Sequence, residues 1–266
     1  MKYSFIIISG LILCFTTTNC YGQNVNIPDA NFKAYLVGNA DINTNGDGEI
    51  QISEANGFTG SIDCSGLSIS YLIGISAFTD LTSLDCWSNK LTSLDVSKNT
   101  ALTYLLCGDN ELTSLDVSKN TALAWLRCGH NQLTSLDVSK NTVLGVVACK
   151  WNQLTSLDVS KNTALTTLWC WSNQLTSLDV SKNTALTLLS CSYNQLTSLD
   201  VSKNTALWGL ECSYNQLKSL DVSKNTALTE LQCGNNKLTS IDVSKNYALA
   251  KLRCAGNQFD CVPFGD

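Results

Sequence analysis

The chain has 266 residues, of which 44% are hydrophobic, so it is long enough and apolar enough to bury a core. Its formal net charge is −5 and it carries only 17 lysines and arginines, which argues against nucleic-acid binding, because that function needs a concentrated basic face. A single histidine leaves little room for a Ser-His-Asp or Cys-His catalytic site and none for a metal site with several histidines.

The chain begins with a segment typical of a secretory signal peptide. Lys2 supplies a positive charge, residues 5–15 form an apolar run of 11 residues, and small and polar residues follow. The apolar run is too short to span a bilayer as a helix. We predict that residues 1–22 are a signal peptide cleaved after Gly22 and that the mature chain has no transmembrane segment. Lipidation at Cys20 is the weaker alternative, because the three residues before it do not form the usual Leu-x-Gly/Ala.

Residues 23–58 are predicted to form a helical cap at the N-terminal end of the mature chain. Within them, residues 26–38 have the pattern of a short amphipathic helix, and stacked repeats need such a cap to cover their first unit.

The second half of this cap contains a twelve-residue stretch, 43–54, with oxygen side chains at positions 1, 3, 5 and 12, glycine at 6 and isoleucine at 8. This stretch resembles the EF-hand calcium loop, in a single dockerin-like copy. The resemblance implies calcium ligands at Asn43, Asn45, Asp47, Glu49 (through its carbonyl), Gln51 (through water) and Glu54. Asparagine at position 1, where aspartate is usual, implies weak binding with a structural role. The alternative is an Asn/Gly-rich turn with a helix cap, and no other cofactor is expected.

From Cys64 onward a fixed period dominates the sequence. Cysteine recurs at ten positions up to Cys254, with a first gap of 22 residues and later gaps of 21. We count eight full units over 81–248 and a partial ninth in the remainder of 81–266, preceded by a degenerate repeat over 59–80. Such a period indicates identical units stacked on one another.

Each unit is predicted to be one coil of a parallel solenoid. In 105–107, Leu-Leu-Cys, successive side chains alternate between inward and outward, and 115–117, Leu-Asp-Val, repeats this alternation, so we expect two short strands per coil. One coil cannot bury its inward leucines, valine and cysteine alone, whereas stacked coils can. The predicted fold class is therefore β-solenoid-like, with parallel strands in short coils and a small α-helical N-terminal cap.

The unit Leu102-x-x-Leu105-x-Cys107-x-x-Asn110-x-Leu112 resembles the leucine-rich repeat. Its second half is a nested copy of the same motif, as in the short bacterial 21-residue subclass, and residues 62–80 resemble the internalin-like form. The resemblance implies a solenoid whose sheet binds partners, usually proteins, without catalysis.

Two repeated columns have architectural interpretations. Asparagines such as Asn110 and Asn120 are predicted to satisfy backbone groups at the turns. The cysteine column suggests disulfides in an exported chain, but stacked strands lie ~4.8 Å apart with parallel side chains, whereas a disulfide needs Cβ atoms near ~3.8 Å. We therefore predict buried, unpaired thiols. Cys261 lies outside the column, and both a free thiol and a bond to Cys254 stay open.

The differences between units point to function. The segment LTSLDVSKNTAL occurs eight times with four departures in 96 positions, whereas the outward columns of the strand segment change in nearly every copy. Drift at exposed sites would affect both parts equally. We therefore predict a ligand-binding face with aromatic and charged contact residues, which are Trp87, Tyr104, Trp125, Arg127, His130, Trp151, Trp169, Trp171, Tyr193, Trp208 and Tyr214.

The resulting hypothesis is a secreted or cell-surface leucine-rich-repeat binding protein. Its partner would be a protein or a glycan on a cell surface or in the extracellular matrix. The alternative is a structural spacer or matrix protein without a specific ligand. An enzyme is not expected, because the repeated columns bring no distinct acid, base and nucleophile together.

Overall fold

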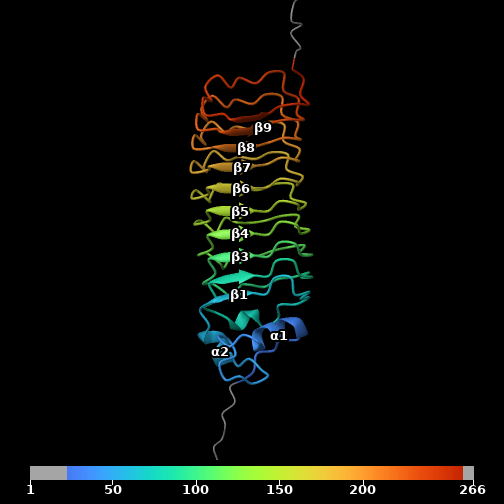
Figure 1. The fold of residues 1–266 in the computed structure, drawn as a ribbon, viewed down its shortest axis with the longest axis vertical. Coiled ribbons are helices and arrows are strands. Elements are labelled where there is room, and N and C mark those ends of the chain that lie inside the picture. Colours follow the sequence, from blue (N-terminus) through green and yellow to red (C-terminus); the bar gives the residue numbers. More distant parts are fainter. Residues whose placement is uncertain (1–22, 260–266) are drawn as a thin grey trace, which may run out of the picture.

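The computed structural model describes residues 23–259, so the predicted signal peptide and Cys261 lie outside the described residues. A parallel sheet of ten three-residue strands runs along the stack in sequence order, with one strand in each coil (Figure 1). The strands are β1 Ser61–Asp63, β2 Ser83–Asp85, β3 Tyr104–Leu106, β4 Trp125–Arg127, β5 Val146–Ala148, β6 Thr167–Trp169, β7 Leu188–Ser190, β8 Gly209–Glu211, β9 Glu230–Gln232 and β10 Lys251–Arg253.

The register of this sheet follows the sequence period. Leu105 pairs with Leu84 on one side and Leu126 on the other, and the middle residue of each strand from β1 to β9 is buried. The degenerate repeat joins without a slip, since Ile62 pairs with Leu84 across the longer gap. The predicted fold class is confirmed.

The prediction of a second strand in each coil is wrong. In residues 23–259 the second half of the coil contributes only one isolated bridge to the pairing, between Asp95 and Asp116. Local bonds take the place of ladder bonds: the Ser118 N–H donates to Asp116 Oδ1 at 2.8 Å, and the Asn120 N–H donates to the Val117 carbonyl at 3.0 Å. Aspartate and serine offer the backbone such turns in competition with a sheet, which explains the difference.

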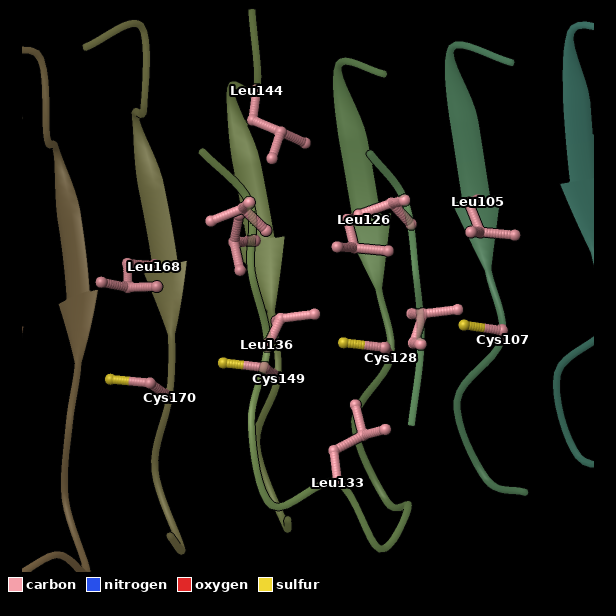
Figure 2. Packing of buried hydrophobic residues seen from close by; sticks show 14 of the residues in the cluster. Leu105, Cys107, Leu126, Cys128, Leu133, Leu136, Leu144, Cys149, Leu168 and Cys170 are labelled. Atoms are coloured by element: carbon pink, nitrogen blue, oxygen red, sulfur yellow. The ribbon is translucent and has the colours of Figure 1, made fainter. Parts of the chain in front are cut away.

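The core consists of columns of leucine, valine and cysteine that run the length of the stack. Figure 2 shows the thiols of Cys107, Cys128, Cys149 and Cys170 projecting in the same direction, one coil after another. The ten cysteines from Cys64 to Cys254 are free, and nine of them are buried, as predicted. Burial raises the pKa of the Cys149 thiol to about 12, which leaves almost no thiolate at neutral pH.

Two columns of buried asparagine tie each coil to its neighbour. In the first column, Asn152 donates from Nδ2 to the carbonyls of Cys128 (3.1 Å) and Cys149 (3.0 Å), and accepts the Leu133 N–H at 3.0 Å. In the second column, Asn162 donates to the carbonyls of Val138 (3.0 Å) and Asn141 (2.9 Å). These amides satisfy turn backbone that would otherwise be buried without partners, so the architectural prediction for both columns is confirmed.

Two helices, α1 Ala30–Val37 and α2 Ile52–Gly57, lie at one end of the stack beside β1 (Figure 1). Asp29 caps α1, since its Oδ1 accepts the backbone N–H groups of Asn31 and Phe32, both at 3.0 Å. The Tyr35 hydroxyl accepts the Asp63 N–H of β1 at 3.0 Å, so the cap satisfies part of the first strand's edge. None of the helices in residues 23–259 has the length and apolar character needed to cross a membrane.

Replacing one asparagine should destabilise the whole stack. We expect Asn152→Ala to lower the free energy of unfolding by roughly 2–4 kcal/mol, because it leaves the buried Leu133 N–H without a partner and removes one of the two asparagine donors from each of the Cys128 and Cys149 carbonyls. Chemical denaturation followed by circular dichroism measures the change. The control is Gln153→Ala at the exposed neighbouring position, and equal midpoints for the two variants would contradict the role of the column.

The buried thiols of the cysteine column should not be alkylated while the protein is folded. In mildly alkaline buffer we expect iodoacetamide to leave Cys149 and Cys191 unmodified, because burial raises the pKa of each thiol to about 12 and excludes the reagent. The same reaction in concentrated guanidinium should alkylate both. Peptide mass spectrometry without reductant makes the comparison, and a disulfide between neighbouring column positions would refute the prediction.

Candidate binding face

The variable columns lie on the outer side of the sheet, where they flank the buried middle residue of each strand. There are four variable columns. The first occupies the first strand position, as Tyr104 does in β3, and the second occupies the third strand position, as Arg127 does in β4. The remaining two columns follow the buried cysteine. Neighbouring coils are held in register, so each variable side chain lies directly beside the one 21 residues away.

Eight of these side chains gather over β3 to β6 in two sets of mutual contacts, which we together name the aromatic ridge. Tyr104 stacks on Trp125 with ring centroids 6.0 Å apart, and the Arg127 guanidinium lies over both Trp125 (5.0 Å) and Trp169 (5.5 Å). The ridge comprises Tyr104, Trp125, Arg127, His130, Lys150, Trp151, Trp169 and Trp171.

The other side of the ridge is built around Trp151. Its ring stacks on His130 with centroids 5.6 Å apart and meets Trp171 edge-on at 5.6 Å, while the Lys150 ammonium lies 5.2 Å from the Trp171 ring centre. Cation–π and ring–ring contacts of this kind hold long side chains in place before any ligand arrives. The ridge is therefore preorganised for contact.

A separate pair of rings lies further along the face. Tyr193 and Tyr214 stack with centroids 4.2 Å apart and planes 10° from parallel. Both rings are about half exposed, at 50% and 47%. Their neighbours in the same column are Ser172 and Asn235, which are smaller than a tyrosine ring, so the outer face of each ring is left open.

Two predicted contact residues lie outside both groups. Trp87 is partly buried and covers Gly108, where an added Cβ would come within 2.2 Å of the indole. Trp208 is 45% exposed just before β8 and takes part in none of the ring pairs found in residues 23–259. The structure thus places nine of the eleven predicted residues in the ridge or the tyrosine pair.

The last variable column has an unusual backbone. Between Ser88 and Asn235 its eight residues all have φ between 51° and 56°, in the left-handed region, and Gly256 continues the series at 73°. An L-residue pays roughly 1–2 kcal/mol there, and glycine, asparagine and aspartate are the usual occupants. The column nevertheless holds His130, Trp151 and two tyrosines. These large side chains occupy a position that stability alone would give to glycine.

The sequence analysis missed this backbone requirement and the contribution of Lys150. The column reads Asp109, Asn235 and Gly256 at three of its positions, and these residue types favour the left-handed region, so the signal was available. Lys150 was not identifiable in advance, because its role depends on the Trp171 ring lying 5.2 Å away on the next coil.

The structure refines the comparison between variable and constant positions. Aspartates such as Asp116 are constant because each accepts a turn N–H, an interaction that lowers the pKa of the carboxyl group. The aspartate column is therefore architectural. Lys119 is exposed and its column is equally constant, and Thr113 is exposed in a column that departs once, at Lys218, so exposed positions have not drifted freely.

The calcium-like loop brings its predicted side chains together. Asp47 Oδ2 accepts from Asn45 Nδ2 (3.1 Å) and Gln51 Nε2 (3.0 Å), while Glu54 Oε1 accepts the Thr44 N–H at 2.8 Å. The carbonyl oxygen of the buried Asn43 side chain has no hydrogen-bond partner. The Glu49 side chain forms an ion pair with Lys33 at 2.6 Å. Its backbone carbonyl is the oxygen that the calcium-loop pattern assigns as a ligand. Among residues 23–259 no group of three or more His, Cys, Asp or Glu side chains is arranged for a metal.

Stacked 21-residue coils, a one-strand-per-coil parallel sheet and asparagine columns define a leucine-rich-repeat solenoid, the fold of several solved bacterial leucine-rich-repeat proteins. The fold of this chain is similar to the functional domain of InlJ from Listeria monocytogenes, which is described as including a cysteine ladder. The identity is 38% and the TM-score 0.74, over 90% of this chain and 58% of that one.

Two further structures share the fold. A leucine-rich-repeat protein of Leptospira interrogans is 24% identical, with a TM-score of 0.67 over 74% of this chain and 54% of its own. An internalin of Listeria monocytogenes, InlF, is 18% identical, with a TM-score of 0.50 over 93% and 95% of the two chains. This chain thus spans little more than half the length of the first two. No family model and no curated protein matches it.

The positive φ angles of the last variable column lead to a prediction about stability. We expect Ser172→Gly to raise the free energy of unfolding by about 0.5–1 kcal/mol, because Ser172 has φ 54° and glycine adopts that conformation without steric cost. Ser172→Ala keeps the Cβ and is the control. Thermal unfolding of the two variants decides the matter, and a lower midpoint for Ser172→Gly than for Ser172→Ala would rule the explanation out.

Proposed function

We propose that this protein is exported to the bacterial surface or beyond it and recognises a protein partner non-covalently through the variable strand face. A glycan is the second candidate ligand. The single observation that carries the proposal is the placement of His130, Trp151, Tyr193 and Tyr214 in left-handed backbone, exposed on one face. Strain of this kind persists where the side chain has a use that outweighs its cost.

The composition of the face supports recognition in a second way. Tryptophan, tyrosine and arginine are the residues that contribute most to binding energy at protein interfaces, and the aromatic ridge consists mainly of them. The preorganised ring and cation contacts reduce the entropy lost on binding. A spacer protein without a ligand, the alternative function, gives no reason for these residues to be concentrated on one face.

Export is proposed from the N-terminal segment. The charged start, the apolar run over residues 5–15 and cleavage after Gly22 would deliver the chain beginning at Gln23 to the outside of the cell. The free thiols of the core are compatible with an oxidising environment, because nine of the ten between Cys64 and Cys254 are buried and each is spaced from the next by a full coil.

A triple substitution on the ridge tests recognition. We expect Trp125→Ala, Trp151→Asn and Trp169→Ala together to weaken binding of the mature chain to immobilised extracellular-matrix proteins or cells at least about tenfold, since each removes a large contact surface. The control combines Thr134→Ala, Thr155→Ala and Thr176→Ala on the constant face, which should bind as the parent does. Equal binding by both triple variants would leave only the spacer function.

We also propose that the loop over residues 43–54 binds calcium weakly and stabilises the cap. The grouping of the Asn45, Asp47 and Gln51 side chains in this loop supports this, because calcium takes several oxygen ligands from one short loop. Asn43, Asn45, Asp47 and Glu54 would hold the ion with their side chains and Gln51 through a water, together with the Glu49 carbonyl.

Calcium should therefore raise the thermal midpoint of the protein relative to EDTA, with an affinity of about 10⁻⁴–10⁻³ M by calorimetry. Asp47→Asn should remove the calcium-dependent rise whatever it does to the midpoint in EDTA. Absence of both binding heat and midpoint change in the parent protein would refute the proposal.

A further inference from the structure

A hollow on the strand face lies apart from the centre of the aromatic ridge, over β7 to β10. Its volume is about 480 Å³, within the roughly 300–1,000 Å³ range of small-ligand sites. Twelve residues line it: Trp171, Ser190, Ser192, Tyr193, Glu211, Ser213, Tyr214, Gln232, Gly234, Asn235, Arg253 and Ala255.

The hollow exists because one column changes size along the stack. The column that follows the buried cysteine reads Lys150 and Trp171 in the ridge, and then serine, serine, glycine and alanine in the next four coils. Ser192 and Gly234 are buried at its base. Trp171 therefore forms an end wall, and the stacked Tyr193 and Tyr214 line one side, where the Tyr214 ring face turned away from Tyr193 stays uncovered.

The floor of the hollow is a connected polar network. Ser190 Oγ donates to Glu211 Oε2 at 2.7 Å, and Gln232 Nε2 donates to Glu211 Oε1 at 3.3 Å and to Glu230 Oε1 at 2.6 Å. Glu230 also forms an ion pair with Lys251. These bonds fix the Glu211 carboxylate, while each of its oxygens keeps a further lone pair for a donor from a ligand.

The chemistry of the lining selects among ligands. Glu211 accepts hydrogen bonds, Arg253 donates them, and Asn235 does both, so a ligand with many hydroxyl groups finds partners of both kinds. One carboxylate and one guanidinium leave the lining without net charge. Its only aliphatic side chain is that of Ala255, so the hollow lacks a pocket for the apolar anchor of a peptide.

We propose that this hollow binds a neutral oligosaccharide, with the apolar face of one pyranose ring against Tyr214 and its hydroxyl groups on Glu211, Asn235 and Arg253. The proposal rests on the proposed function, because it assumes that the strand face is a binding surface, and it assigns a sugar subsite to one part of that face.

The experiment pairs an oligosaccharide array with calorimetry, using the mature chain and free lactose, cellobiose, maltose and chitobiose as probes. Tyr214→Asn removes the ring and keeps a residue suited to φ 56°, as Asn235 already does one coil further on. Glu211→Gln removes the charged acceptor. Tyr247→Asn is the matched control, since it makes the same change at an exposed tyrosine in the constant half of the coil, outside the hollow and the ridge.

We expect at least one neutral probe to bind, with affinity reduced roughly tenfold or more by Tyr214→Asn and by Glu211→Gln and unchanged in Tyr247→Asn. Sialylated versions of the same sugars should bind no better than the neutral ones. Circular dichroism confirms that each variant is folded before it is scored.

Other outcomes overturn the proposal in distinguishable ways. Sugar binding that survives both Tyr214→Asn and Glu211→Gln but is lost in the ridge triple variant would move the site to the ridge and refute the hollow. Binding of no sugar, together with protein binding that the ridge triple variant abolishes, would refute the sugar subsite and leave the proposed function standing. Binding of neither sugars nor proteins by the parent chain would overturn both.

Discussion

The structure depends on the hydrogen bonds that buried asparagine side chains make to the backbone of neighbouring coils. A coil of 21 residues with one three-residue strand leaves most of its turn backbone outside the sheet, and a buried amide without a partner costs free energy. Asn152 resolves this for two carbonyls and one N–H at once. Because Cys128 and Leu133 lie on the preceding coil and Cys149 lies on its own, these bonds satisfy the turn and also fix the spacing and register of the two coils.

That constraint explains why so much of the fold could be predicted. A repeated period with inward leucine, cysteine and asparagine has one good packing solution, in which equal residues lie above one another. The second strand was mispredicted because inward–outward alternation at Leu115, Asp116 and Val117 occurs in both a strand and this turn. The turn differs from a strand in the hydrogen bond from the Ser118 N–H to Asp116 Oδ1, which competes with pairing in a sheet. The alternation of side chains gives no information about this bond.

The variable strand face was predictable in its location but not in its internal arrangement. The sequence alone located this face, because the Thr113 column is nearly constant across the repeats whereas the outward strand columns vary. The contacts within it depend on side-chain directions on two coils, as where Arg127 lies over both Trp125 and Trp169. Each of these contacts joins residues 21 or more positions apart or depends on a rotamer, so spacing alone could not assign them.

Rigid register also explains how one surface can hold two kinds of chemistry. In a globular fold, replacing a tryptophan by a serine changes the surrounding packing, whereas here the change from Trp171 to Ser192 lies on the outer side of a sheet whose core columns are unaltered. The volume removed therefore becomes open space instead of being filled by collapse. Small residues over four successive coils produce a hollow, and large residues over the preceding coils produce a ridge. The stack can thus vary the size and polarity of one column coil by coil, at little cost to its own stability, and that freedom is what the variable strand face requires.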